Sequence, residues 1–242
     1  MAASAGEPRK VLVLGASSTI GAAVCARYAE AGYRVLAHFH RNGQSVGRLS
    51  TAHQGIEPVS CDLADLHAVE SLAATDEVRA CDALVCLAAD AGPTTIESLD
   101  IEALIRTMNV GALANYVLIG ALGPSMAERG YGRIVIGSSI GVKFGGGTDS
   151  FAYALANHTS EFIPRAATQW ASRGVLTNVV RIGVTDTPIH GAFPGRDMAE
   201  RTRLIPIQRL ATPTEVASFI VDLGSDRNTY VTGQVMAISG GE

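Results

Sequence analysis

The chain has 242 residues, of which 47% are hydrophobic and 17% charged, and it contains 26 glycines. This composition is typical of one sheet-centred α/β domain with a substantial core, and it excludes a disordered chain. The net charge of −4 gives no reason to expect nucleic acid or an anionic membrane as a partner, and we find no uninterrupted apolar run long enough to cross a bilayer.

The cysteines Cys25, Cys61, Cys81 and Cys86 lack the spacing of a metal site, and we predict no metal. Reduced thiols in the core of a cytoplasmic protein account for them. Residues 1–8 lack the apolar segment of a signal peptide, so we expect a flexible tail. A single domain is expected to follow over residues 9–242.

The first predicted elements are a buried strand at 11–14, which Gly15 ends, and a helix at 20–31, which Gly32 ends. Further strands are predicted at 33–39, 55–62, 82–87, 132–137, 175–181 and 234–238. Further helices are predicted at 64–78, 96–129, 151–172 and 213–223, with Pro164 kinking the third of these or marking a boundary. Residues 40–48 are expected to form a polar loop, and residues 183–206 an irregular flap. The apolar stretch 110–122 indicates either a subunit contact or a fully buried helix.

Strands that alternate with helices predict a single-domain, Rossmann-type, doubly wound parallel sheet of about seven strands with helices on both faces. In such sheets ligands bind beyond the carboxyl ends of the strands. The loops at 15–21, 39–43, 62, 88–93, 137–147 and 182–188 are therefore expected to share one rim.

The turn between the first strand and the first helix is a candidate phosphate site, because such turns aim free backbone N–H groups at an anion. Gly15 and Gly21 have the required positions, but Thr19 stands where a complete glycine fingerprint has its middle glycine. Two glycines that serve only tight packing would produce the same pattern.

Ser139 lies on the same rim as Tyr153, and Asn157 is one helical turn beyond Tyr153 on the same helix face. With these residues the chain resembles a short-chain dehydrogenase/reductase, closest to the 3-oxoacyl-[acyl-carrier-protein] reductase branch, over residues 9–241. The motif positions are Gly15, Gly21, Asp62, Asn109, Ser139, Tyr153, Asn178, Gly183 and Thr187. The most specific matches, near the C-terminus, are Arg209, Pro213, Glu215, Val216, Ala217, Thr232, Gly233, Gln234, Gly240 and Gly241.

The resemblance implies hydride transfer between a nicotinamide cofactor and a carbonyl group. Tyr153 would protonate the developing alkoxide, Ser139 would hold the same oxygen, and Asn109 would support a helix bend and a proton-relay water. By the same resemblance, the cofactor would contact Gly15, Ser17, Ser18, Thr19, Ile20, Gly21, Arg41, Asp62, Leu63, Ala88, Gly183 and Thr187.

Several residues depart from the family pattern. Asn157 replaces the lysine that grips the nicotinamide ribose and lowers the pKa of the tyrosine, which favours slow reduction over oxidation. Lys143 would bring a charge nearby only if its loop folds inward. Residues 86–89 and Ile182 also differ from the family's motif residues.

The end of the second strand carries His40, Arg41 and Asn42 but no carboxylate, so we predict NADP(H) with Arg41 as the phosphate partner. An ordinary solvated loop arginine is the alternative. Asp62 is expected to meet the adenine edge. The flap residues Ile189, Phe193 and Met198 would suit an acyl chain near the arginines 196, 201 and 203. Arg129 and Arg173 match positions that resemble a carrier-docking pair.

Three hypotheses follow for the function. The first is NADPH-dependent reduction of a 3-oxoacyl thioester or similar ketone, free or bound to a carrier protein, with Asn157 in the lysine's place. The second is an impaired reductase-like subunit that assembles with an active relative, and the third is a regulator that binds NADP(H) without turnover. By the resemblance, the helices at 96–129 and 150–172 and the last strand would form the contacts of a tetramer.

Overall fold

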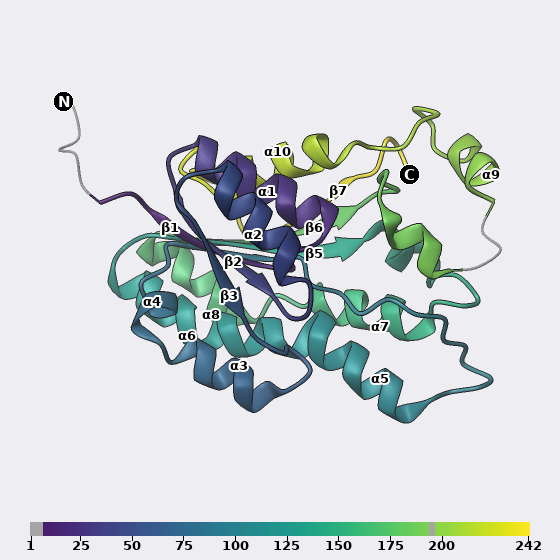
Figure 1. The fold of residues 1–242 in the computed structure, drawn as a ribbon, viewed down its shortest axis with the longest axis horizontal. Helices are drawn as coiled ribbons and strands as arrows, with labels where there is room; N and C mark the ends of the chain where they lie inside the picture. Colours follow the sequence, from purple (N-terminus) through teal and green to yellow (C-terminus); the bar gives the residue numbers. More distant parts are fainter. Residues whose placement is uncertain (1–6, 194–196) are drawn as a thin grey trace.

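The computed structural model describes residues 7–193 and 197–242, and its centre is a seven-stranded parallel sheet. The strands lie in the order β3-β2-β1-β4-β5-β6-β7, so β2 and β3 are added on one side of β1 and β4 to β7 on the other (Figure 1). Their bounds are Lys10–Leu14 (β1), Arg34–Phe39 (β2), Ile56–Ser60 (β3), Ala83–Cys86 (β4), Gly132–Ser139 (β5), Val175–Ile182 (β6) and Val235–Ile238 (β7). The predicted doubly wound sheet is confirmed.

Helices cover both faces of the sheet (Figure 1). One layer contains α1 (Thr19–Glu30), α2 (Gly43–Ala52) and α10 (Pro213–Leu223). The opposite layer contains α3 (Leu66–Ala73), α4 (Asp76–Arg79), α5 (Ile101–Met108), α6 (Ala114–Glu128), α7 (Phe151–Ser160) and α8 (Arg165–Gln169). Short helices complete the described chain: η1 (Asn109–Leu113), η2 (Ile140–Phe144), η3 (Trp170–Arg173), η4 (Pro188–Ala192) and α9 (Met198–Arg203).

Alternate side chains of each strand enter different cores, as two-sided burial requires. In β1, Leu12 and Leu14 pack with the α3 and α6 layer, whereas Val11 and Val13 pack with the α1 and α10 layer. All four side chains are inaccessible to solvent. The continuous apolar run predicted for this strand is therefore explained by helices on both faces.

The predicted polar loop at 40–48 is wrong, because most of it belongs to α2. Asn42 caps this helix by accepting a hydrogen bond from the Ser45 N–H, and Val46 is its only fully buried residue. This segment contains few apolar residues, so its sequence gives only a weak signal for a helix. The helix predicted at 64–78 is divided, because α3 ends at Ala73 and Thr75 caps the start of α4.

The predicted helix at 151–172 ends at Ser160, and Pro164 marks the boundary before α8 with an extended ψ of 143°. The helix predicted from residue 96 begins only at Ile101 and contains a π-helical turn at Asn109–Leu113. The flap over 183–206 contains η4 and α9, and residues 194–196 of that prediction lie outside the described residues. Residues 1–6 of the predicted tail also lie outside them.

Contrary to our expectation, the helical segment Ile101–Glu128 is long and apolar enough to span a membrane by length and composition alone. It contains an 18-residue window with a mean hydropathy of 1.4. Over half of that window, 56%, is buried inside the protein. Leu118 and Leu122 are inaccessible to solvent within one chain. Packing on the sheet thus accounts for much of the apolar stretch 110–122 without a second subunit.

Candidate active site

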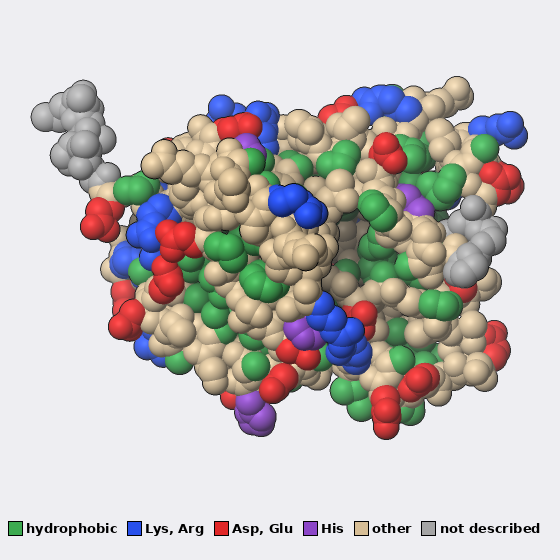
Figure 2. Space-filling model, in the orientation of Figure 1, with side chains coloured by type: hydrophobic (Ala, Val, Ile, Leu, Met, Phe, Trp, Pro, Cys, Tyr) green, Lys and Arg blue, Asp and Glu red, His purple; other side chains and the backbone are tan. Residues whose placement is uncertain are grey.

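A cavity of about 1120 Å³ opens at the carboxyl edge of the strands. The loops after β1, β4, β5 and β6 form its inner walls, and η4, α9 and the last residues of the chain close its outer side. Figure 2 shows the hollow on the face of the molecule that Figure 1 presents. The predicted residues on its wall are Ser17, Ser18, Thr19, Ile20, Ala88, Ser139, Tyr153, Asn157, Gly183 and Thr187.

The turn before α1 presents a helix N-terminus to this cavity. Gly15 has a φ of +77°, and the Ser18 hydroxyl donates to its carbonyl oxygen at 2.8 Å while accepting from the Gly21 N–H at 3.0 Å. A Cβ atom on Gly21 would lie 2.1 Å from the Gly15 carbonyl oxygen, so only glycine permits this close turn. The first N–H groups of a helix have no partner within it, so the turn is chemically suited to a phosphate group.

His38 braces this turn, a role that our sequence analysis missed. Its Nδ1 accepts from the Gly15 N–H at 3.2 Å, so the proton lies on Nε2, which donates to the Cys61 carbonyl oxygen at 3.0 Å. Burial lowers the pKa of His38, although the hydrogen bond to Cys61 opposes this effect. The only signal in the sequence is a histidine inside the apolar strand at 34–39.

Other predicted cofactor residues lie away from the cavity wall of the described structure: Gly15, Gly21, Arg41, Asp62 and Leu63. Arg41 is exposed two residues beyond the end of β2. Asp62 accepts from the Ala64 N–H at 3.0 Å and lies 3.6 Å from His40 Nδ1. The Leu63 side chain is buried in the core, so only its backbone is available to a ligand.

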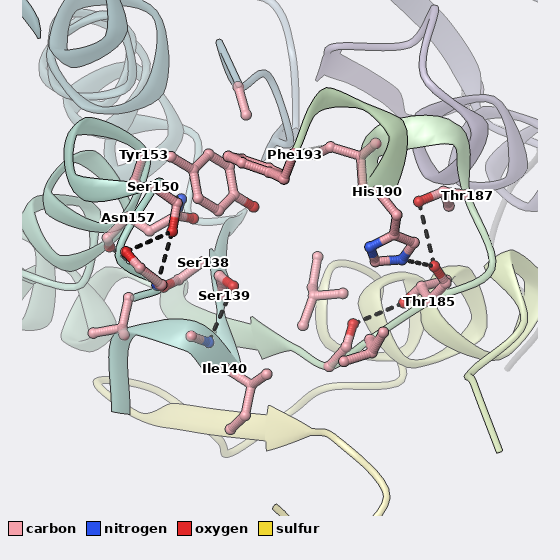
Figure 3. Close-up of a pocket in the computed structure, with 18 of the residues that line it drawn as sticks. Ser138, Ser139, Ile140, Ser150, Tyr153, Asn157, Thr185, Thr187, His190 and Phe193 are labelled. Atoms are coloured by element: carbon pink, nitrogen blue, oxygen red, sulfur yellow. Dashed lines mark hydrogen bonds between the residues drawn. The ribbon is translucent and has the colours of Figure 1, made fainter. Parts of the chain in front are cut away.

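Ser139, Tyr153 and Asn157 lie together on one wall of the cavity (Figure 3). The Ser139 hydroxyl accepts from the Gly141 N–H at 3.1 Å, and the Tyr153 ring meets the buried Phe193 ring edge-on at 6.0 Å. The Asn157 amide donates to the Tyr153 carbonyl oxygen at 2.8 Å, one turn back in α7. Asn157, which stands in place of the lysine that binds the nicotinamide ribose, therefore also makes a hydrogen bond within its own helix.

Asn109 lies at the first position of the π-helical turn, and its amide donates to the Ala64 carbonyl oxygen at 2.9 Å. Its side chain thus ties the helix to the segment after β3 at the point where the helix changes geometry. Asn109 is not among the described residues that line the cavity. This geometry suits the predicted support of a helix bend.

A partly buried ion pair supports the wall that carries Tyr153. The Glu161 carboxylate accepts from Arg181 at 2.7 and 2.6 Å and from the Ser138 hydroxyl at 2.8 Å. The Ser138 hydroxyl also lies 3.3 Å from the Asn157 carbonyl oxygen. Burial raises the pKa of Glu161, but the hydrogen bonds from Arg181 and Ser138 outweigh it, so the net pKa is lowered. Our sequence analysis did not find this pair, because its members lie on different elements.

The opposite wall follows β6. The Thr185 carbonyl oxygen accepts from His190 Nε2 at 2.7 Å and from the Thr187 hydroxyl at 3.3 Å. Lys143 lines the cavity as an exposed residue, with its Nζ 5.6 Å from the centroid of the Phe144 ring. Ile189, Phe193 and Met198 also line the cavity, as expected for the flap.

The arginines considered for carrier docking lie elsewhere. Arg129 and Arg173 precede β5 and β6, so they lie at the edge of the sheet opposite the cavity. The Arg129 guanidinium donates to the carbonyl oxygens of Arg79 and Cys81 at 2.9 and 2.6 Å, which is a bracing role. All four cysteines are free and buried, as predicted for core thiols. Among residues 7–193 and 197–242 no cluster of three His, Cys, Asp or Glu side chains is arranged to hold a metal.

A doubly wound sheet, a helix N-terminus and a serine–tyrosine pair on one cavity define a candidate dinucleotide-dependent oxidoreductase. A family model described as enoyl-(acyl carrier protein) reductase matches residues 15–242. The chain is 33% identical to cis-4-hydroxycyclohexanecarboxylate dehydrogenase of Sinomonas cyclohexanicum, with 96% of each chain covered. It is 27% identical to the 3-oxoacyl-[acyl-carrier-protein] reductase FabG of Vibrio harveyi, with 97% of each chain covered.

A solved structure from Beutenbergia cavernae, described as an NAD(P)-dependent gluconate 5-dehydrogenase with bound NADP, superposes with a TM-score of 0.87. It is 34% identical and covers 96% of this chain and 95% of its own. The chain therefore belongs to the short-chain dehydrogenase/reductase family of oxidoreductases. These relatives act on different substrates by their descriptions, so family membership leaves the substrate open.

Proposed function

We propose that this protein uses NADPH to reduce a ketone, in the form of a 3-oxoacyl thioester or a similar compound, to the hydroxy product. The observation that carries the proposal is the placement of Ser139 and Tyr153 on the same cavity as the N-terminus of α1. A dinucleotide whose pyrophosphate meets this helix can extend along the carboxyl edge toward the tyrosine. The NADP bound to the Beutenbergia cavernae relative supports this choice of cofactor.

The nicotinamide cofactor would supply a hydride to the carbonyl carbon of the substrate. The Tyr153 hydroxyl donates its proton to the carbonyl oxygen as negative charge develops there, and the Ser139 hydroxyl donates a hydrogen bond to the same oxygen. Asn157 brings no positive charge to the tyrosine. A neutral phenol is the form that protonates an alkoxide, so this wall favours reduction.

Activity towards acetoacetyl thioesters tests the proposal, with NADPH oxidation as the readout. Turnover that is lost in Tyr153→Phe supports it. Tyr131→Phe serves as the matched control, because Tyr131 lies outside the cavity and packs between Arg9 and Arg133. A protein that binds NADPH but reduces no ketone, in either the wild type or Asn157→Lys, contradicts it.

A second candidate is an impaired subunit that assembles with an active relative. The engagement of the Asn157 amide with its own helix favours this candidate, because that amide replaces a charged ribose contact. In this case the wild type shows no turnover, and Asn157→Lys gains measurable NADPH-dependent turnover. Binding of NADP(H) without turnover in every variant would instead indicate a regulator.

Arg41 is proposed as the partner of the 2′-phosphate of NADP(H). Its exposed side chain follows β2, and the adjacent residues His40 and Asn42 supply no carboxylate for the ribose hydroxyls of NAD. Arg41→Ala should weaken NADPH binding about 10-fold or more and leave NADH binding unchanged, since a charge-assisted bond contributes about 1.5–3 kcal/mol. Arg48→Ala, at an exposed position in α2, is the control. Equal affinity of the wild type for NADPH and NADH would contradict the assignment.

Assembly into a homotetramer, or into a hetero-oligomer with a related reductase, is part of the same proposal. The outer edge of β7 supports it, since Val235 is 42% exposed and the nearby Tyr230 is 92% exposed. Light scattering that detects only monomers would remove this part. We place the protein in the cytoplasm because four free, buried thiols suit a reducing compartment.

A further inference from the structure

The outer wall of the cavity holds a buried carboxylate. The Glu242 side chain is only 5% exposed, and its Oε1 accepts from Arg201 Nη2 at 2.5 Å. Its Oε2 is buried and has no hydrogen-bond partner among the described residues. Both Glu242 and Arg201 line the cavity that contains Tyr153. A buried acceptor without a donor is costly, so this oxygen is a position where a ligand gains by supplying one.

His190 adds a second acceptor on this side of the cavity. Its Nε2 lies 2.7 Å from the Thr185 carbonyl oxygen, which can only accept, so Nε2 carries the proton. In the neutral ring Nδ1 then has a lone pair to offer. Figure 3 shows this nitrogen directed into the cavity, on the side facing Tyr153. The ring is therefore held with its acceptor toward the space in which a substrate would lie.

The charges around these acceptors select the kind of donor. Arg201 already neutralises Glu242, so the carboxylate does not require a cation as a further partner. An anionic substituent would meet the lone pairs of both residues, and an alkyl chain would leave Oε2 without a donor. A neutral hydroxyl group satisfies Oε2 without adding charge.

We infer that Glu242 accepts a hydrogen bond from a hydroxyl group on the part of the substrate remote from the reacting carbonyl, and that His190 Nδ1 is available to accept from a second donor of the substrate. The substrate class is a ketone that carries a hydroxyl group several bonds from the carbon to be reduced. This inference rests on the proposed function for the carbonyl end of the substrate. It adds a specificity determinant to the outer wall of the cavity.

The test compares ketones that differ only in the terminal hydroxyl group. Calorimetry on the protein saturated with NADP⁺, which cannot reduce a ketone, measures the affinity of each 2-alkanone and its ω-hydroxy analogue from butanone to heptanone. At one chain length the hydroxyketone should bind about 10- to 100-fold more tightly, since a hydrogen bond to a charged group contributes that much. Glu242→Leu should abolish the difference, and Glu242→Gln, which keeps an acceptor oxygen, should retain part of it.

Glu200→Gln is the matched control, because Glu200 is an exposed carboxylate in the same helix as Arg201. This variant should preserve the preference for the hydroxyketone, and thermal unfolding checks that every variant is folded. Equal binding of the two ketones at every length, no detectable binding of any hydroxyketone, or an unchanged preference in Glu242→Leu overturns the inference. Because no hydride transfer is involved, these results are independent of whether NADPH turnover, and with it the proposed function, fails.

Discussion

The ion pair of Glu161 and Arg181, which supports the cavity wall that carries Tyr153, allows a sharp test of how this structure is stabilised. Glu161→Ala removes the acceptor of two bonds from Arg181 and one from the Ser138 hydroxyl. The Glu161 side chain is 8% exposed and that of Arg181 is 30% exposed. Breaking a fully buried pair costs about 3–5 kcal/mol. Because Arg181 can regain some water, we expect a loss of about 2 kcal/mol in the free energy of unfolding.

The same value predicts a shift in thermal unfolding. At about 2.1 cal/mol/K per residue, the unfolding entropy of a 242-residue chain is about 0.5 kcal/mol/K, so Tm should fall by about 4 °C. Denaturant titration gives the free energy directly and shows whether the cooperativity is preserved. The exposed pair Arg27–Glu30 is the matched control, and Glu30→Ala should cost no more than about 0.5 kcal/mol.

A double variant separates the pair from the packing of its parts. Glu161→Leu with Arg181→Leu leaves no uncompensated charge, so it should be more stable than either single variant. A loss below about 0.5 kcal/mol in Glu161→Ala, or a double variant whose losses simply add, would refute this account. The dependence of this stability on pH follows from the lowered pKa of Glu161. The ion pair stabilises the folded protein fully above pH 4.5, the ordinary pKa of a glutamate, and this contribution is lost as the pH falls through the pKa of Glu161 in the folded state.

Two further predictions concern the turn before α1. Burial lowers the pKa of His38 below 6.5, so the unfolded chain binds a proton more readily than the folded protein does, and the free energy of unfolding should rise with pH in the range below 6.5. In denaturant titrations at several pH values, His38→Gln should flatten this slope. An unchanged slope would contradict the bracing role of His38. Gly21→Ala places a Cβ against the Gly15 carbonyl oxygen and should weaken NADPH binding about 10-fold or more, whereas Gly47→Ala in α2, where a Cβ meets nothing within 4 Å, should bind NADPH as the wild type does. Calorimetric titration with NADPH compares the two variants, and equal affinity would count against the close turn.

The regular elements were largely predictable, because local periodicity reports which side chains are buried. The apolar run at β1 predicted a strand buried on both faces, and the alternation of strands with helices predicted the parallel sheet. The helix α2 escaped prediction because Val46 is its only fully buried residue. The π-helical turn at Asn109 escaped it too, since its hydrogen bond to the Ala64 carbonyl oxygen joins residues far apart in sequence.

The sequence by itself determined the family, the order of the elements, and the presence of Ser139 and Tyr153 on the rim, since these depend on motifs and on spacing within one element. Only the tertiary structure decided which groups meet: Glu161 with Arg181, His38 with Gly15, and the buried Glu242 oxygen on the cavity wall. Those contacts join different elements across long stretches of chain. Their formation depends on how the layers pack, and no local pattern records it.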